Sequence, residues 1–279
     1  MPYHSTDTVC GFAGILPETL RRWRRAGLVA TPGRPGYTDA QLSAVLRVRD
    51  LTAEGHRLCD VYAVMKWPAL TLSGGWAFRE EEMLLLLQRS TDQDVQNEMR
   101  KMATDYCTED FINRYLRPLN LWLRSDLSSE AAGRLGRFHR SVLEQWRIMS
   151  VAAAGRRCVP LFLEPVSVTD ETEIWMEAIR LTGQGFRVEV AEEGQRIARR
   201  RHEHHLMWCG NGISAAELQR FHLRCESGEC VMLTGPDTGL RAVKPEQCAS
   251  QSKRPAEAGL HKFWRVQTKT RWKKSARLA

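Results

Sequence analysis

The most concentrated chemical signal in the sequence is the positive charge of residues 16–29, LPETLRRWRRAGLV, which hold four arginines and one tryptophan. Arginine guanidinium groups donate paired hydrogen bonds to phosphate oxygens and to the edge of guanine. A solvated helix face would have the same composition. The sequence therefore leaves two interpretations open for this segment, a solvated surface or a surface that meets nucleic-acid phosphate.

The segment has residues typical of the start and the end of a short helix. Pro17 suits a first helical turn, where its missing N–H would be unpaired anyway, and Glu18 suits the positive end of the helix dipole. Leu20 and Trp23 lie three residues apart on one face, so one of them can pack inward, and Gly27 is a common terminator. With the short helix expected in TDTVCGFAGI upstream, the pattern predicts a helix-turn-helix.

The segment downstream predicts a small ribbon and two further helices. ATPGRPGYTDAQL is a Pro/Gly-rich excursion, and Thr38 is a candidate N-cap for a helix over residues 39–54. Another short helix is expected after Gly55, in EGHRLCDVYAVM. Helix, helix, small ribbon, helix and helix is the layout of a winged helix.

Residues 3–66 resemble the MerR family of transcription regulators. PETLRRWRRAGLV is similar to that family's recognition helix, and YTDAQL to the start of its third helix. The wing differs, because GRPGY is shorter than the family pattern and lacks its second arginine. The resemblance implies a homodimer on double-stranded promoter DNA, acting with RNA polymerase. It implies a DNA-contacting set of Thr19, Arg21, Arg22, Trp23 and Arg25 on the helix, with Arg34 and Tyr37 in or beside the wing.

The periodicity of the chain predicts a multidomain protein of mainly α and α/β structure. The expected parts are a winged helix-turn-helix domain (residues 1–66), a hinge (67–77), a four-helix bundle (78–155), a small Rossmann- or flavodoxin-like parallel-sheet domain (156–235) and a basic, disordered tail (236–279). Candidate N-caps in the bundle are Thr91 or Asp92 and Thr108 or Glu109. The sheet domain is expected to alternate strands with helices, one of them over 192–201.

This order of domains resembles the cobalamin-dependent, light-sensing branch of the MerR family, but the cofactor motif is degenerate. After Asp170, the cobalt-ligating histidine of that branch is replaced by Thr172, and its glycine by Trp175. Threonine is a poor cobalt ligand, and an indole fills the room that glycine leaves. The Asp-x-Thr-x-x-Trp form and the WCG at 208–210 are similar to the curli and biofilm regulators of enterobacteria. We therefore expect no cofactor; a sensor that keeps a small molecule, or residual cobalamin, in the cleft between bundle and sheet domain is the alternative.

Charge and cysteine usage set the remaining limits. The chain carries a net charge of +8, but residues 241–279 alone carry +9, so the rest is nearly neutral. The tail also holds aromatic residues, so contact with DNA or an acidic membrane face is an alternative to disorder. Eight scattered cysteines without a C-x-x-C pair, no signal sequence and no apolar run of membrane length predict a cytoplasmic protein that does not span a membrane.

Other motifs are weaker. RRRHEHHL at 199–206 offers three histidines, for which we expect a solvated loop rather than a metal site. No nucleophile-base or paired-carboxylate arrangement is readable, so the sequence favours a regulator over an enzyme. A scaffold that acts through its C-terminal half without binding DNA is a third class of function.

Overall fold

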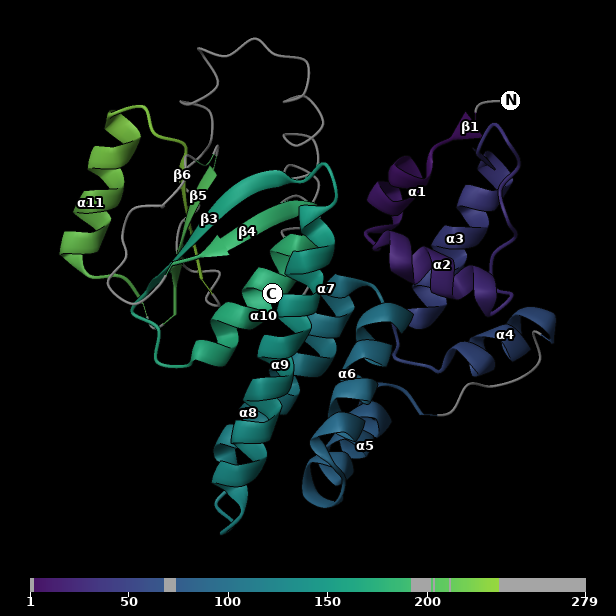
Figure 1. Cartoon of the computed structure of the whole chain (residues 1–279), viewed down its shortest axis with the longest axis horizontal. Helices are drawn as coiled ribbons and strands as arrows, with labels where there is room; N and C mark the ends of the chain where they lie inside the picture. Colours follow the sequence, from purple (N-terminus) through teal and green to yellow (C-terminus); the bar gives the residue numbers. More distant parts are fainter. Residues whose placement is uncertain (1–2, 68–73, 192–201, 203, 211, 236–279) are drawn as a thin grey trace, which may run out of the picture. The chain divides into compact units, whose positions relative to one another are not determined.

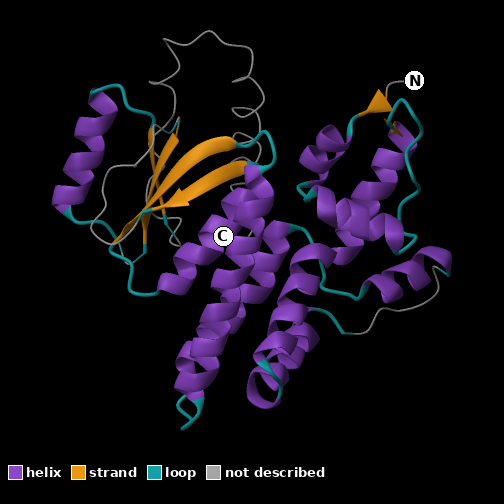
Figure 2. Ribbon diagram, viewed as in Figure 1, coloured by secondary structure: helices purple, strands orange, loops and turns teal. Residues whose placement is uncertain are grey.

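The computed structural model describes residues 3–67, 74–191, 202, 204–210 and 212–235. Within them the chain is mostly helical, with one parallel sheet of four strands (Figures 1 and 2). This agrees with the predicted mixture of α and α/β structure. Most of the expected hinge lies outside the described residues, as do the helix expected over 192–201 and the whole basic tail. No helix in the described part is long and apolar enough to cross a membrane.

The N-terminal part contains four helices and a two-stranded ribbon. Side-chain caps set two of the helix starts: Ser5 accepts a hydrogen bond from the backbone of Thr8, and Thr38 forms a capping box with Gln41, as the sequence predicts for Thr38. The ribbon strands pair antiparallel, with Tyr3 opposite Thr38. The elements are β1 (Tyr3–His4), α1 (Thr6–Ala13), α2 (Pro17–Arg25), β2 (Tyr37–Thr38), α3 (Asp39–Thr52) and α4 (Leu58–Lys66).

The middle of the chain forms four helical stretches with short connections. They are α5 (Trp76–Arg89), α6 (Asp92–Asp105), the continuous run of α7 (Thr108–Asp110), η1 (Phe111–Leu116) and α8 (Arg117–Ser125), and α9 (Ala131–Ala154). Thr91 caps α6, as predicted. The predicted cap at Thr108 is wrong: Cys107 caps α7, and Thr108 is its first helical residue. The side chain of Thr108 instead fills the space beside Gly183, where an added Cβ would lie 2.6 Å from it.

The C-terminal part is the parallel sheet with two helices. The strands β3 (Val159–Val166), β4 (Phe186–Val190), β5 (His204–Cys209) and β6 (Val231–Thr234) lie in the order β4-β3-β5-β6. The helices α10 (Glu171–Gly183) and α11 (Ala215–Glu226) follow β3 and β5. Because these two crossovers run in opposite directions from the sheet centre, right-handed connections place the helices on opposite faces (Figure 1).

Two features of the core tie these parts together. Met176 and Ile179 of α10 belong to the same buried apolar cluster as Met83, Met99 and Phe138 of the helical middle. Cys107, which follows α6, belongs to the apolar cluster of α1–α4. The helical middle therefore shares apolar core with both the N-terminal helices and the sheet part.

Candidate nucleic-acid interface

The helix α2 begins and ends where local chemistry dictates. Proline occupies its first turn with Glu18 beside it, and Arg22, Arg24 and Arg25 occupy its last turn, where positive charge complements the helix dipole. Gly27 lies just beyond the helix with a φ of +74°. This is a left-handed conformation that glycine adopts without strain. The chain thereby turns away sharply and leaves the arginines at the helix surface.

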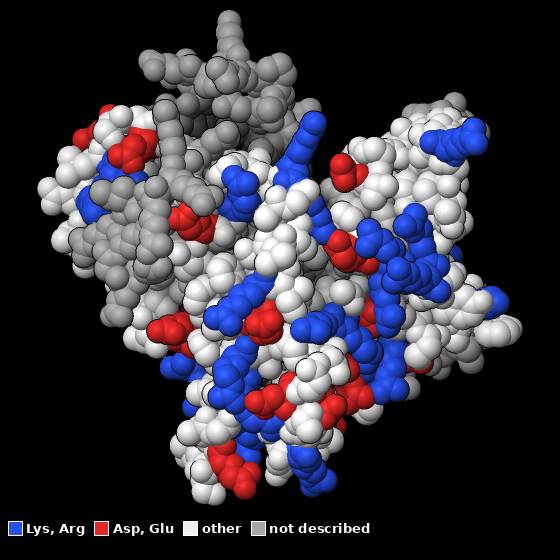
Figure 3. Space-filling model, viewed as in Figure 1, with Lys and Arg blue, Asp and Glu red and all other residues white. Residues whose placement is uncertain are grey.

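The arginines of the predicted set lie at the surface. Arg21, Arg22 and Arg25 on α2 are exposed, and so is Arg34 in the turn before β2. In Figure 3, Lys and Arg side chains gather over α2 and the neighbouring helices. The side chain of Arg22 is 47% exposed, and its Nε donates a hydrogen bond of 2.7 Å to Asp105 at the end of α6. Arg21, Arg25 and Arg34 are therefore exposed at the surface, while Arg22 already has a protein partner.

The other three residues of the predicted set are buried. Thr19 and Trp23 are 0% exposed and Tyr37 is 1% exposed. The indole Nε1 of Trp23 donates a 2.8 Å hydrogen bond to the backbone oxygen of Asp105. In this conformation all three side chains lie in the interior, and the Trp23 hydrogen bond ties α2 to the end of α6. The sequence separates α2 from its partner by more than eighty residues, so no local signal could have revealed this.

Asp105, the partner of Arg22, lies outside the arginine-rich motif and was not among the predicted site residues. Its side chain is only 8% exposed. Burial raises the pKa of its carboxyl above the ordinary value, although Arg22 opposes the shift. Glu18 at the other end of α2 forms a second ion pair, with Arg156 after α9. The helix that carries the arginines is thus anchored at both ends to the helical middle of the chain.

The degenerate cofactor positions lie at the carboxyl end of β3, where parallel sheets commonly bind ligands. Asp170 caps α10 through the backbone N–H of Thr172, and it also accepts a 2.6 Å hydrogen bond from Asn120 and pairs with Arg124 at 3.1 Å. Its role in the structure is to fasten α10 to α8.

Thr172 and Trp175 face α9. The hydroxyl of Thr172, a residue 3% exposed, lies 3.0 Å from Nδ1 of His139. The Trp175 ring packs against Trp146 with centroids 4.8 Å apart and an angle of 38° between the planes. Side chains of the protein itself therefore fill the contact between α9 and α10, and the residues present do not fit a cobalt-bound corrinoid there. His139 and Trp146 were not among the sequence-predicted site residues.

The predicted solvated loop at the histidine tract is wrong in part. His204 and His205 belong to β5, and His205 is 8% exposed, because β5 lies between β3 and β6 and α11 packs over it. Nε2 of His205 lies 2.7 Å from Glu164, whose carboxylate also pairs with Arg220 at 2.7 Å. Burial by itself would raise the pKa of Glu164, but these two partners hold it below the ordinary value. Within the described residues no group of three or more His, Cys, Asp or Glu side chains could hold a metal ion.

Comparison with known proteins adds to this geometry. Residues 161–229, from β3 to α11, match the family described as Transcriptional regulator MlrA, C-terminal domain. The chain is 21% identical over 251 residues to the HTH-type transcriptional regulator MlrA of Escherichia coli K12, an alignment that covers 84% of this chain and all of that protein. The chain is similar to MlrA. The MlrA of Salmonella typhimurium SL1344 is also 21% identical over 230 residues, covering 79% of this chain and 93% of that protein.

Proposed function

We propose that this chain is a sequence-specific DNA-binding transcription regulator. In this proposal α1–α4 with the β1–β2 ribbon form a MerR-type winged helix, and α2 is the helix that enters the major groove. The observation that carries the proposal is the set of exposed arginines on and beside α2. It is supported by relatives that are named HTH-type transcriptional regulators and that align along nearly their whole length.

In this proposal the exposed and the buried residues of the predicted set have different roles. Arg21 and Arg25 on α2 are proposed to read base edges or phosphates, and Arg34 to contact phosphate from the wing. Trp23 and the other buried residues of the set hold α2 at a fixed angle. Arg22 can contribute only by leaving or sharing Asp105.

The other parts of the chain complete the proposed regulator. One winged helix reads one half-site, so we propose a homodimer on promoter DNA that acts with RNA polymerase. The helices α5–α9 serve as a four-helix bundle, and the sheet part serves as a flavodoxin-like domain, consistent with its strand order β4-β3-β5-β6. By resemblance to the curli and biofilm regulators, the proposed targets are curli and biofilm genes or related envelope and virulence genes.

The test begins with a genome-wide map of the sites that the protein occupies. On a recovered site, Arg21→Ala should weaken binding by about 1–3 kcal/mol if the side chain reads a base edge. Arg147→Ala, on α9, removes the same charge from a side chain that is 61% exposed and should leave the affinity nearly unchanged. Equal affinities of wild type and of the Arg21→Ala and Arg25→Ala variants at matched salt would exclude α2 as the reading helix.

A further inference from the structure

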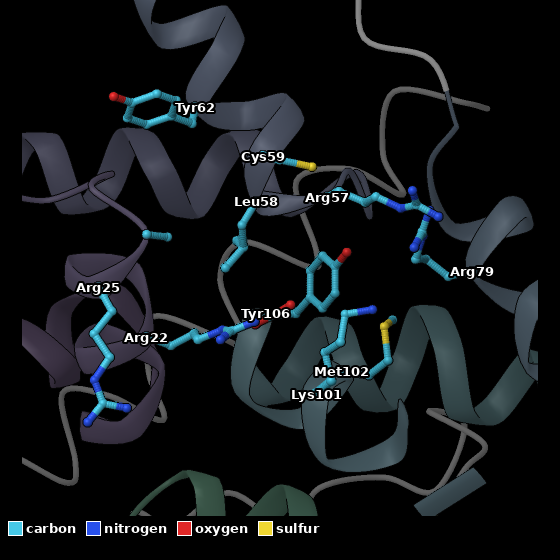
Figure 4. Close-up of a pocket in the computed structure, with 12 residues that line it drawn as sticks. Arg22, Arg25, Arg57, Leu58, Cys59, Tyr62, Arg79, Lys101, Met102 and Tyr106 are labelled. Atoms are coloured by element: carbon cyan, nitrogen blue, oxygen red, sulfur yellow. The ribbon is translucent and has the colours of Figure 1, made fainter. Parts of the chain in front are cut away.

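A hollow lies between the helices α2, α4, α5 and α6. It has a volume of about 480 Å³ and is lined by residues of α2, α4, α5 and α6, with flanking turns. Figure 4 shows five cationic side chains around it, Arg22, Arg25, Arg57, Arg79 and Lys101. A volume of several hundred cubic ångströms is typical of sites that take small molecules.

The cations of the hollow are only partly neutralised. Arg22 pairs with Asp105, Lys101 pairs with Glu98 at 3.0 Å, and Glu82 serves both Arg57 and Arg79. Among the described residues, Arg25 is in no ion pair shown by the structure. Three carboxylates pair with four of the five cations, and Asp60 is a fourth carboxylate close to Arg57, so the hollow keeps a small excess of positive charge.

Arg79 is the group that most needs a further partner. It is 4% exposed, and its Nη1 lies 2.5 Å from Glu82. Its Nε is buried and has no hydrogen-bond partner in the described part of the chain. A buried N–H without an acceptor costs free energy, so an acceptor that enters the hollow would recover that cost.

The hollow also has an apolar wall. Leu58 and Met102 are 7% and 1% exposed, and the ring of Tyr106 stands between the arginines of α2 and Arg57 (Figure 4). The Tyr106 hydroxyl donates to the backbone oxygens of Gly55 and His56, so the ring is held in one orientation. A fixed aromatic wall beside clustered guanidinium groups suits an anion that carries an organic body.

We propose that this hollow binds a phosphate-bearing small molecule, its phosphate oxygens held by Arg79, Arg57 and Lys101. Guanidinium groups match phosphate geometry, and a phosphate offers more acceptors than one carboxylate. The small molecule is favoured over a DNA phosphate because the buried Arg79 is out of reach of a duplex. Arg22 and Arg25 of α2 form the side of the hollow opposite Arg57.

The test is calorimetric titration of the full chain with inorganic pyrophosphate and with guanosine monophosphate, at constant ionic strength and without DNA. We expect saturable binding of at least one probe at one site per chain. Lys101→Met, at a side chain 44% exposed, should weaken it roughly tenfold, the effect of losing one charge-assisted hydrogen bond. Arg57→Met, at a side chain 46% exposed, should do the same. Arg100→Met is the matched control on α6, since Arg100 is exposed and does not line the hollow.

Three outcomes would overturn the proposal. The first is that neither probe binds saturably up to about 10 mM, a limit weaker than ordinary ligand affinities. The second is that Arg100→Met weakens binding of the probe as much as Lys101→Met does, which indicates unspecific attraction by charge. The third is that neither probe binds while Lys101→Met flattens the salt dependence of DNA binding, which assigns the hollow to the DNA backbone. Because the titrations contain no DNA, their failure leaves the proposed regulator function untouched.

Discussion

The contact between Arg22 and Asp105 makes a quantitative prediction about stability. Arg22→Ala leaves a carboxylate that is 8% exposed without its cation. A hydrogen bond to a charged group contributes about 1.5–3 kcal/mol, and the half-exposed Arg22 side chain reduces that figure, so we expect a loss of about 1–2 kcal/mol at pH 7. For a chain of this size each kcal/mol lowers the melting temperature by roughly 2–4 °C.

The pH dependence has a defined sign. Burial raises the pKa of Asp105 above its ordinary value, and the loss of Arg22 raises it further. The Asp105 carboxyl group therefore binds its proton more tightly in the folded protein than in the unfolded chain. The free energy of unfolding therefore falls as the pH rises through the raised pKa of Asp105. This destabilisation disappears below the pKa that Asp105 has in the unfolded chain. The difference between wild type and Arg22→Ala should be largest at neutral pH and should narrow on acidification.

Differential scanning calorimetry at a fixed scan rate, at pH 7 and at a pH near 5, measures both effects. In an Asp105→Asn background, Arg22→Ala should cost less, because no buried charge remains to be stranded. Arg140→Ala, which removes an exposed ion pair with Asp92, should change stability by less than about 0.5 kcal/mol. Equal costs of Arg22→Ala in both backgrounds, at both pH values, would refute the assigned partnership.

Three further predictions follow from other parts of the chain. Truncation after Leu240 should lower the affinity for random and for operator DNA by similar factors and flatten the salt slope by about 0.9 per lost phosphate contact; loss of operator preference would place the tail in the reading surface. Protein reconstituted with methylcobalamin should leave a desalting column colourless, because Thr172 and Trp175 are committed to His139 and Trp146; stoichiometric corrinoid absorbance would contradict this. Gly55 has a φ of +82°, and a Cβ added there would lie 2.7 Å from the backbone nitrogen of Trp76. Gly55→Ala should therefore destabilise the fold by about 1–3 kcal/mol in chemical denaturation, and a change within about 0.5 kcal/mol, typical of an ordinary surface site, would refute this.

Local features of the fold could be predicted from the sequence. The starts of α2, α3 and α6 depend on Pro17, Thr38 and Thr91, and each of these acts on backbone groups no more than about four residues away. The alternation of strands and helices after Gly155 is equally readable, because apolar periodicity is a property of consecutive residues. The resemblance to regulators also rests on such contiguous stretches.

Burial of single side chains could not be predicted in the same way. The periodicity of α2 shows that Leu20 or Trp23 packs inward, but only the packing of α6 against α2 decides that Trp23 is wholly buried and that Arg22 has a carboxylate partner. The burial of His205 could not be predicted for the same reason, since it depends on the position of β5 between β3 and β6 and on the packing of α11 over it.

By itself, then, the sequence determined where the arginine helix begins and ends and how much charge it carries. Tertiary structure decided which of those charges remain available to a ligand. The physical reason is distance along the chain: caps and turns are satisfied within one helical turn, whereas desolvation and ion pairing depend on groups such as Asp105 that the chain brings back only after more than eighty residues.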